Sequence, residues 1–207
     1  MRRLLVIACA SLSVFCGCAA RRVERVVPPP LDAEAVTAAV MAKADADGDG
    51  LVRQNELGNV PALVGARAEL DRNKDGGISK AELREWLGFV KDSEIAISQI
   101  SGVVMHRQKP LANAIVTLLP EPFMGPDVAV ARGVTDAEGR FAPTIPDGRY
   151  PGVNCGLYRV EISGTGNDGT PLNRFQGGTS PLGLAVGGML PTGGVVTLTL
   201  DEPASGR

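Results

Sequence analysis

The chain has 207 residues, of which 21 are basic and 23 are acidic, and its formal net charge is −2 at pH 7. This balance lacks the basic excess of nucleic-acid-binding proteins, so no nucleic-acid partner is expected. One histidine and four cysteines provide poorly for Ser-His-Asp, Cys-His or zinc-hydrolase chemistry, so we assign no catalytic residue.

The N-terminus has two arginines followed by a short apolar run, residues 4–15. This order is typical of a secretory signal, and the run is shorter than the roughly 20 apolar residues that a transmembrane helix needs. The end of the run resembles the lipobox of bacterial lipoproteins, with a small Gly17 before Cys18. The resemblance implies a signal peptide over residues 1–18 and a lipid on Cys18. An ordinary signal peptide that is cleaved nearby is the alternative.

Residues 19–30 follow the signal and end in three prolines. Consecutive prolines favour an extended helix of about 3.1 Å per residue, so this segment is predicted to be a stiff tether. We expect an exported protein that its lipid anchors in a membrane, facing the periplasm or the cell surface. In the mature chain Cys155 is the one cysteine besides Cys18. It has no partner for an intramolecular disulfide and is expected to be buried filler.

Two twelve-residue segments follow one chemical plan: DADGDGLVRQNE at 45–56, the first loop, and DRNKDGGISKAE at 71–82, the second loop. Both fit D-x-[DN]-x-[DN]-G-x₅-E, a calcium-loop pattern. Calcium takes roughly six to eight oxygen ligands, and side chains at positions 1, 3, 5 and 12 with the carbonyl at position 7 supply them. The candidate metal ligands are Asp45, Asp47, Asp49, Leu51 and Glu56 in the first loop, and Asp71, Asn73, Asp75, Gly77 and Glu82 in the second.

Position nine of the pattern, where a water often bridges to the ion, differs between the loops. Arg53 holds this position in the first loop. It cannot be a ligand, and its charge near the ion predicts that the first site is the weaker one. Ser79 holds the position in the second loop, where it can bind a water and also cap the following helix.

Apolar residues at helical spacing flank both loops. A helix is expected from about Leu31 to the first loop, and Pro61 suits the start of the helix that leads into the second loop. After the second loop, Ser79 and Glu82 form a capping box. After the first loop, Gly58 and Pro61 limit the helix to about one turn. The apolar positions of these helices are Val36, Val40, Met41, Leu63, Leu70, Leu83, Trp86, Leu87 and Val90.

Two such loops with helices around them resemble the EF-hand family, as a compact pair over residues 31–91. Dockerin modules also carry two such loops, but they lack the helices that enter them. The resemblance implies Ca²⁺ as the cofactor and a short antiparallel strand contact through position eight, which is Val52 and Ile78. A segment of this size holds little core, so metal is expected to help it fold.

Residues 95–207 have a different texture, with glycine and proline between short runs of apolar and β-branched residues. This texture predicts an antiparallel β domain. The turn at 136–139 is expected to close a hairpin, and the glycine-rich segment 164–194 to be a loop over one edge. The expected strands include residues 100–105, 114–119, 128–134, 140–144, 158–162 and 196–200.

Four motifs in this part occur in the order found in carboxypeptidase regulatory-like, or transthyretin-like, domains. They are G-x-V at 102–104, P-L-x-x-A-x-V at 110–116, T-D-x-x-G-x-F at 135–141 and G-x-Y-x-V at 156–160. The resemblance implies a seven-stranded Greek-key β-sandwich, a fold that usually has an adhesive or structural role in this family. Transthyretin-like hydrolases use histidines that have no counterparts here, so the resemblance implies no activity.

Together these patterns predict an α+β multidomain chain that resembles exported lipoproteins of planctomycete type. We expect a calcium-binding lipoprotein of the cell envelope, with a non-catalytic sandwich that interacts with a protein or another envelope component. In this prediction the EF-hand pair is a metal-braced spacer between the anchor and the sandwich. A calcium sensor that exposes a binding surface on loading, and an enzyme of unrecognised class, remain as alternatives.

Overall fold

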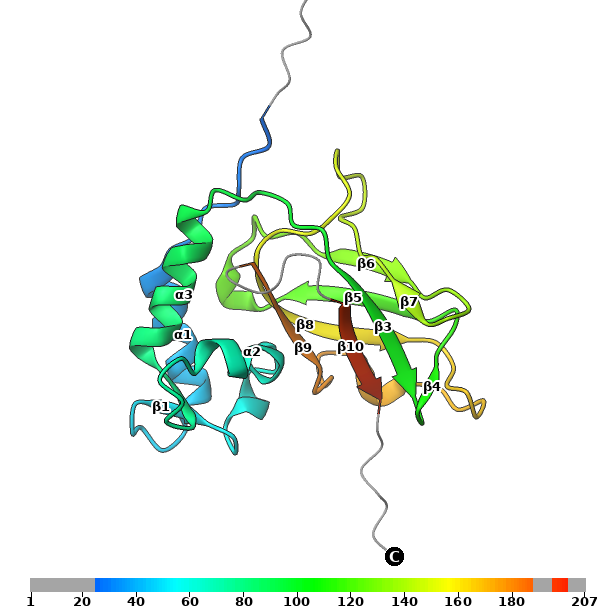
Figure 1. Ribbon diagram of the computed structural model, residues 1–207, viewed down its shortest axis with the longest axis horizontal. Coiled ribbons are helices and arrows are strands. Elements are labelled where there is room, and N and C mark those ends of the chain that lie inside the picture. Colours follow the sequence, from blue (N-terminus) through cyan, green and yellow to red (C-terminus); the bar gives the residue numbers. More distant parts are fainter. Residues whose placement is uncertain (1–24, 188–194, 201–207) are drawn as a thin grey trace, which may run out of the picture.

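Three helices gather at one end of two β-sheets, so the fold is α+β (Figure 1). The computed structural model describes residues 25–187 and 195–200. The predicted signal peptide, the predicted lipidation site Cys18 and the first part of the predicted tether lie outside the described residues. We call residues 31–91 the helical part and residues 95–200 the β part.

The helical part has the elements that the sequence predicts around the two loops. Asp32 caps the first helix by accepting a hydrogen bond from the backbone amide of Ala35 at 3.0 Å. Ser79 and Glu82 form the predicted capping box at the start of the third helix. The helix after the first loop is a single 3₁₀ turn, as expected. The elements are α1 Ala33–Ala44, β1 Leu51–Arg53, η1 Leu57–Asn59, α2 Ala62–Leu70, β2 Gly77–Ser79 and α3 Lys80–Asp92.

The two loops meet in a two-stranded antiparallel sheet formed by β1 and β2. Val52 pairs with Ile78 at its centre, and both side chains are buried. This contact is the one that the EF-hand resemblance implies. It holds the two loops side by side on a common apolar base.

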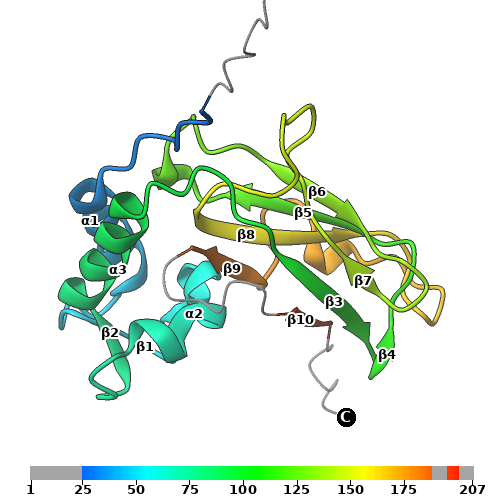
Figure 2. The same ribbon diagram turned by 45° about the horizontal axis from the view of Figure 1, so that its top comes forward.

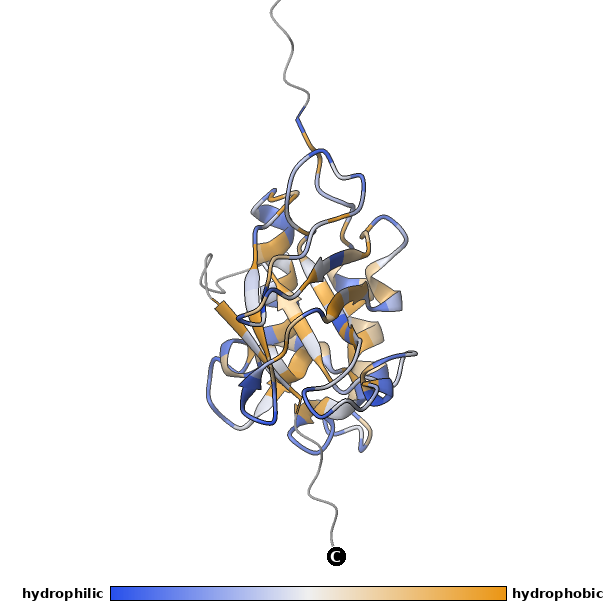
Figure 3. Cartoon of the chain, turned by 90° about the vertical axis from the view of Figure 1, so that its right-hand side faces the viewer, coloured by the Kyte–Doolittle hydropathy of each residue, from blue (hydrophilic) through white to orange (hydrophobic). Residues whose placement is uncertain are grey.

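The β part forms two four-stranded sheets. One has the order β6-β5-β8-β9 with every neighbouring pair antiparallel. In the other, β10 and β4 flank β3, and β7 also pairs with β3. Figure 3 shows hydrophobic residues concentrated in the strands and helices. The elements are β3 Ser101–His106, β4 Lys109–Pro110, β5 Ile115–Pro120, η2 Pro122–Met124, β6 Ala131–Val134, β7 Arg140–Phe141, β8 Gly156–Ser163, η3 Asn173–Phe175, β9 Gly183–Val186 and β10 Val195–Leu200.

One strand direction differs from the prediction of an antiparallel domain. β10 runs parallel to β3, from Val195 opposite Ser101 to Leu200 opposite His106. A parallel pair needs a long crossover connection, and here strands β4 to β9 lie between the two partners. Alternation of apolar and polar residues has the same period for either direction, so the sequence pattern does not distinguish them. The described residues of the β part contain eight strands, one more than the seven expected.

The predicted hairpin at 136–139 connects the two sheets instead of closing a pair within one. The amide of Asp136 donates to the carbonyl of Arg140 at 2.9 Å, which makes the tight turn. β6 then pairs with β5, whereas β7 pairs with β3 in the other sheet. A single bridge between Arg132 and Thr144 joins the two arms of the hairpin.

The glycine-rich segment expected to be a loop contains a strand. β9 pairs with β8, with Leu184 opposite Tyr158 and Val186 opposite Gly156. The run at 183–186 is short, begins with Gly183 and is followed by Gly187, which hides its strand character in the sequence. Residues 188–194 of the segment lie outside the described residues.

The helical part packs directly on the β part through α2 and β9 (Figure 2). A Cβ atom added to Gly183 would lie 2.1 Å from the carbonyl carbon of Pro61 and 2.2 Å from the nitrogen of Ala62. Buried residues of both parts belong to one continuous hydrophobic cluster. The helical part therefore packs against the β part and shares its core, instead of standing apart from it as a separate spacer.

Candidate metal centre

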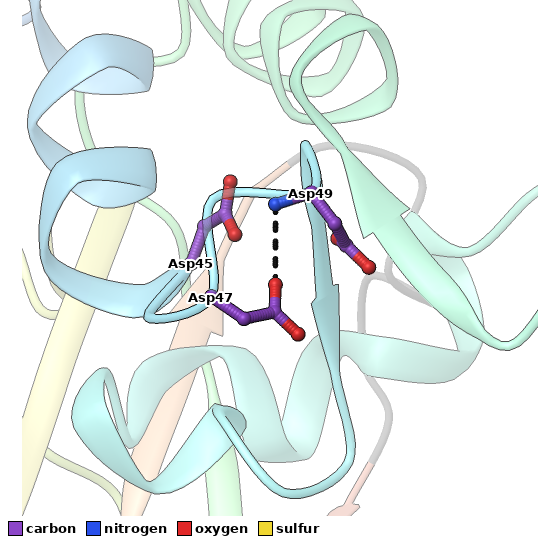
Figure 4. A group of neighbouring side chains, drawn as sticks. All are labelled: Asp45, Asp47 and Asp49. Carbon is purple, nitrogen blue, oxygen red and sulfur yellow. Dashed lines mark hydrogen bonds between the residues drawn. The ribbon is translucent and has the colours of Figure 1, made fainter.

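The first loop gathers three carboxylates. One oxygen each from Asp45, Asp47 and Asp49 lie within 4.8 Å of one another (Figure 4). Backbone amides inside the loop orient these groups: Gly50 donates to Asp45 Oδ2 at 3.0 Å, and Asp49 donates to Asp47 Oδ1 at 3.1 Å. The spacing of the pattern thus brings the predicted ligands of positions 1, 3 and 5 together.

Glu56, at position 12, closes the first loop. Its Oε1 accepts from the amide of Ala46 at 2.7 Å and its Oε2 from the amide of Arg53 at 2.9 Å. These two hydrogen bonds, the one from Arg53 more than the one from Ala46, lower the pKa of this carboxyl below its usual value. The side chain is buried and ionised at neutral pH, which suits a ligand for a cation.

The second loop repeats this arrangement. The amide of Gly76 donates to Asp71 Oδ2 at 3.1 Å, and the amide of Asp75 donates to Asn73 Oδ1 at 2.9 Å. Glu82 closes the loop, with Oε1 accepting from the amide of Asn73 at 3.2 Å. The hydrogen bonds of the second loop thus repeat those of the first, while Asp45, Asp47 and Asp49 are the predicted ligands whose oxygens lie within 4.8 Å of one another. The two backbone ligands, Leu51 and Gly77, are the first residues of β1 and β2.

Glu82 also has the charge state of a ligand. Burial acts to raise its pKa, but hydrogen bonds from the amide and hydroxyl of Ser79 and from the amides of Asn73 and Arg72 outweigh burial, and the pKa lies below its usual value. The Ser79 hydroxyl donates to Oε2 at 2.8 Å. Position nine of the second loop thus supports the carboxylate at position 12.

One carboxylate oxygen of the second loop lacks a hydrogen-bond partner, as expected for an oxygen that binds a cation. Asp71 Oδ1 is buried and has no hydrogen-bond partner. An orphaned buried carboxylate oxygen is costly unless a positive group completes its surroundings. Because the candidate ligands are all oxygens, a hard divalent cation such as Ca²⁺ is the group that they fit, and Asp71, Asp75 and Glu82 would help to hold it.

The sequence analysis did not identify Arg67, which connects the two loops. From α2 its guanidinium donates to Gln54 Oε1 of the first loop at 2.7 Å and to the Gly76 carbonyl of the second at 3.1 Å. No spacing rule marks this residue, because the contact depends on how α2 lies beneath both loops. It adds a polar link to the β1–β2 contact.

Cys155 and His106 lie outside the metal centre. Burial raises the pKa of the Cys155 thiol to about 11, and the side chain is buried, as predicted for a filler. His106 is buried at the end of β3, where its Nδ1 accepts from the backbone amide of Asn167 at 3.0 Å.

The comparisons with known proteins bear on the second loop. The family model described as EF hand matches residues 68–87, which cover the end of α2, the second loop and part of α3. No curated protein and no solved structure matches the chain. The family match and the Asp45, Asp47, Asp49 cluster support an EF-hand element and a divalent cation.

Within residues 25–187 and 195–200, none of the helices combines the length and apolar character needed to cross a bilayer.

Proposed function

We propose that this protein is a calcium-binding component of the cell envelope, in which an EF-hand pair is joined to a non-catalytic β-sandwich of the carboxypeptidase regulatory-like type. The observation that carries the proposal is the second loop. There an EF-hand match coincides with a buried, unpartnered Asp71 oxygen and an ionised Glu82. For an exported module we expect a dissociation constant of about 10⁻⁴ to 10⁻³ M, which makes calcium structural more than signalling.

Isothermal titration with calcium tests this proposal. The protein should take up calcium at millimolar concentration, and Glu82→Gln should lower the affinity of the second site at least tenfold, since a neutral amide replaces a charged ligand. The matched control is Glu85→Gln on the same helix, because Glu85 pairs with Arg72 at the surface. No uptake of calcium by the unchanged protein would contradict the proposal.

The proposed anchor is a lipid on Cys18, with the membrane as one partner. The end of the tether supports this arrangement, because Pro28, Pro29 and Pro30 lie against α3 and the β part, where they line a pocket of about 230 Å³. Arg25 also pairs with Glu94 after α3. Residues 25–30 therefore have a defined place on the surface of the folded part. Detergent-phase partitioning of the protein expressed in a bacterium, lost in Cys18→Ala, is the test.

The β part is proposed to act by binding a protein or another envelope component, with no catalytic role and no nucleic-acid partner. Its cysteine and its histidine, Cys155 and His106, are poorly placed for catalysis. The raised pKa of Cys155 keeps its thiol protonated at neutral pH. His106 is buried with its Nδ1 already accepting a hydrogen bond.

A calcium sensor is the second candidate, and one pocket favours it. Leu70, Trp86 and Phe89 line a largely apolar pocket of about 110 Å³ between the end of α2 and α3, and Phe89 is 49% exposed. Opening of the helices on calcium loading would enlarge this surface. A hydrophobic dye should then bind more strongly with calcium than without it, and an unchanged dye signal would exclude the sensor role.

A further inference from the structure

The acidic and basic residues of the two loops favour tighter calcium binding by the first loop. This order is the opposite of the one expected from Arg53, which predicts that the first site is the weaker. The first loop contains four acidic residues and one basic residue, whereas the second contains three of each. Calcium affinity in such loops rises with the number of charged ligands. The ligand set of the first loop is therefore intrinsically the stronger one.

Arg53 changes this order, because it contacts a ligand directly. Its guanidinium, at position nine, forms an ion pair with Asp49 Oδ2 at position five. The other oxygen of Asp49 accepts from the amide of Leu51 at 2.9 Å. Both oxygens of this candidate ligand are thus engaged, one of them by a cation. Asp75, at the same position of the second loop, also has both oxygens engaged, but by the neutral amides of Asn73 and Gly77.

The second loop lacks such a cation at the same position. Ser79 is uncharged, and its hydroxyl donates to Glu82 instead of to the residue at position five. Asp71 Oδ1 in this loop has no hydrogen-bond partner at all. An arriving cation meets no competing guanidinium among these ligands.

We infer that Arg53 is a tethered competitor for the cation of the first loop. The guanidinium neutralises Asp49 at low calcium, and calcium must displace it to complete the site. The second loop consequently fills first, and the first loop fills at a higher concentration. This inference rests on the proposed calcium binding of both loops and adds to it the contact through which Arg53 weakens the first loop, an ion pair with the ligand Asp49 that calcium must displace.

The ion pair of Arg53 and Asp49 is exposed enough for calcium and the guanidinium to compete reversibly for Asp49. The side chain of Arg53 is 44% exposed and that of Asp49 is 36% exposed. Exposed ion pairs are weak, so a divalent cation can displace the guanidinium, which moves into water without losing a buried partner. Arg53 therefore raises the calcium threshold of the first loop without blocking the site.

Two backbone amides allow each loop to be followed separately. The amides of Gly50 and Gly76 each donate to the position-one aspartate of their own loop, at 3.0 and 3.1 Å. In ¹⁵N-labelled protein their resonances should shift when the respective loop binds calcium. In the unchanged protein, Gly76 should reach its midpoint at lower calcium than Gly50.

Arg53→Ser, which copies the residue of the second loop, should lower the Gly50 midpoint by about three- to fivefold, toward or below the Gly76 midpoint. The matched control is Arg72→Ser. This substitution removes the same charge from a calcium loop, but Arg72 pairs with Glu85 on α3 and not with a ligand. The control should move the Gly50 midpoint by about twofold at most.

The outcomes are distinguishable. If neither glycine responds to calcium, the proposed calcium binding is wrong. If both respond and Arg53→Ser leaves the Gly50 midpoint in place, calcium binding stands and the competitor role is wrong. An equal shift in Arg72→Ser would also overturn the inference, because net charge alone would then explain the effect.

Discussion

The side chain of Asp168 holds the loop after β8 against the turn between β3 and β4. It forms an ion pair with Arg107 at 2.6 Å and accepts hydrogen bonds from the hydroxyl and amide of Thr170. The backbone amide of the neighbouring Asn167 donates to His106 Nδ1, and the side-chain amide of Asn167 donates to the carbonyl of Lys109. A few polar contacts thus fix a glycine-rich loop that has little apolar material of its own.

Asp168 should make stability depend on pH in the acid range. The Thr170 hydroxyl and amide, with the charge of Arg107 adding to them, lower the pKa of its carboxyl from 3.8 to about 2. A lowered folded-state pKa gives stability that is complete above the unfolded-state value and is lost as the pH falls through the folded-state value. Asp168→Asn should therefore flatten the decline of the urea midpoint between about pH 4 and pH 2. An unchanged slope in this variant would contradict the assignment.

Lys43 connects the last turn of α1 to the β part. Its ammonium lies 3.0 Å from an oxygen of Glu121, which is 1% exposed and precedes η2. The other oxygen of Glu121 has no hydrogen-bond partner, and the nearest guanidinium nitrogen, from Arg159, lies 3.6 Å away. Lys43 is therefore the main partner of a buried carboxylate. It also lies two residues before the first ligand of the first loop, Asp45.

Lys43→Met should lower the free energy of unfolding by about 1–2 kcal/mol, because it leaves the buried charge of Glu121 without its hydrogen-bond donor. Arg84→Met is the control: Arg84 pairs with Glu34 at the surface, with both side chains more than half exposed. Its loss should cost at most about 0.5 kcal/mol. Urea denaturation measures both changes, and equal effects would show that Glu121 is not dependent on Lys43.

The contact of α2 with β9 gives a sharper test of how the elements pack. Gly183→Ala should destabilise the fold by about 2–4 kcal/mol, since the added methyl meets backbone atoms of Pro61 and Ala62 that cannot move independently. Gly88→Ala in α3 is the control, because a Cβ atom there meets no heavy atom within 4 Å. That substitution should be neutral or stabilising, as alanine favours helices. The urea midpoint should fall clearly in Gly183→Ala and stay the same or rise in Gly88→Ala, and an equal fall in both variants would contradict the prediction.

At the scale of elements, the sequence predicts best what local chemistry determines. The loop pattern, the Ser79–Glu82 box and the shortened turn near Gly58 depend on residues a few positions apart, and all three occur. The direction of β10 and the strand at 183–186 depend on distant partners that periodicity does not identify. The same holds for Arg53 and Arg67, whose contacts require the folded loops.

At the scale of the whole molecule, the two parts share one hydrophobic cluster that runs from α1 to β10. The β1–β2 contact, the close approach at Gly183 and the Lys43–Glu121 pair all connect the calcium loops to this core. Free energy of calcium binding in the loops should then stabilise the β part as well. This is a linkage between the metal and the whole fold, and it needs no change of shape.

Calcium removal should consequently lower one common melting temperature. At calcium tenfold above the dissociation constant, one site contributes about 1.4 kcal/mol, which corresponds to a shift of about 3–6 °C for a chain of this size. Fluorescence of Trp86, the one tryptophan of the chain, reports on the helical part, and far-ultraviolet circular dichroism reports on both parts. The two melting curves should coincide with calcium and again with a chelator, as two-state unfolding requires. Two separate transitions, of which the Trp86 transition alone responds to calcium, would mean that the interface of α2 and β9 is too weak to couple the two parts.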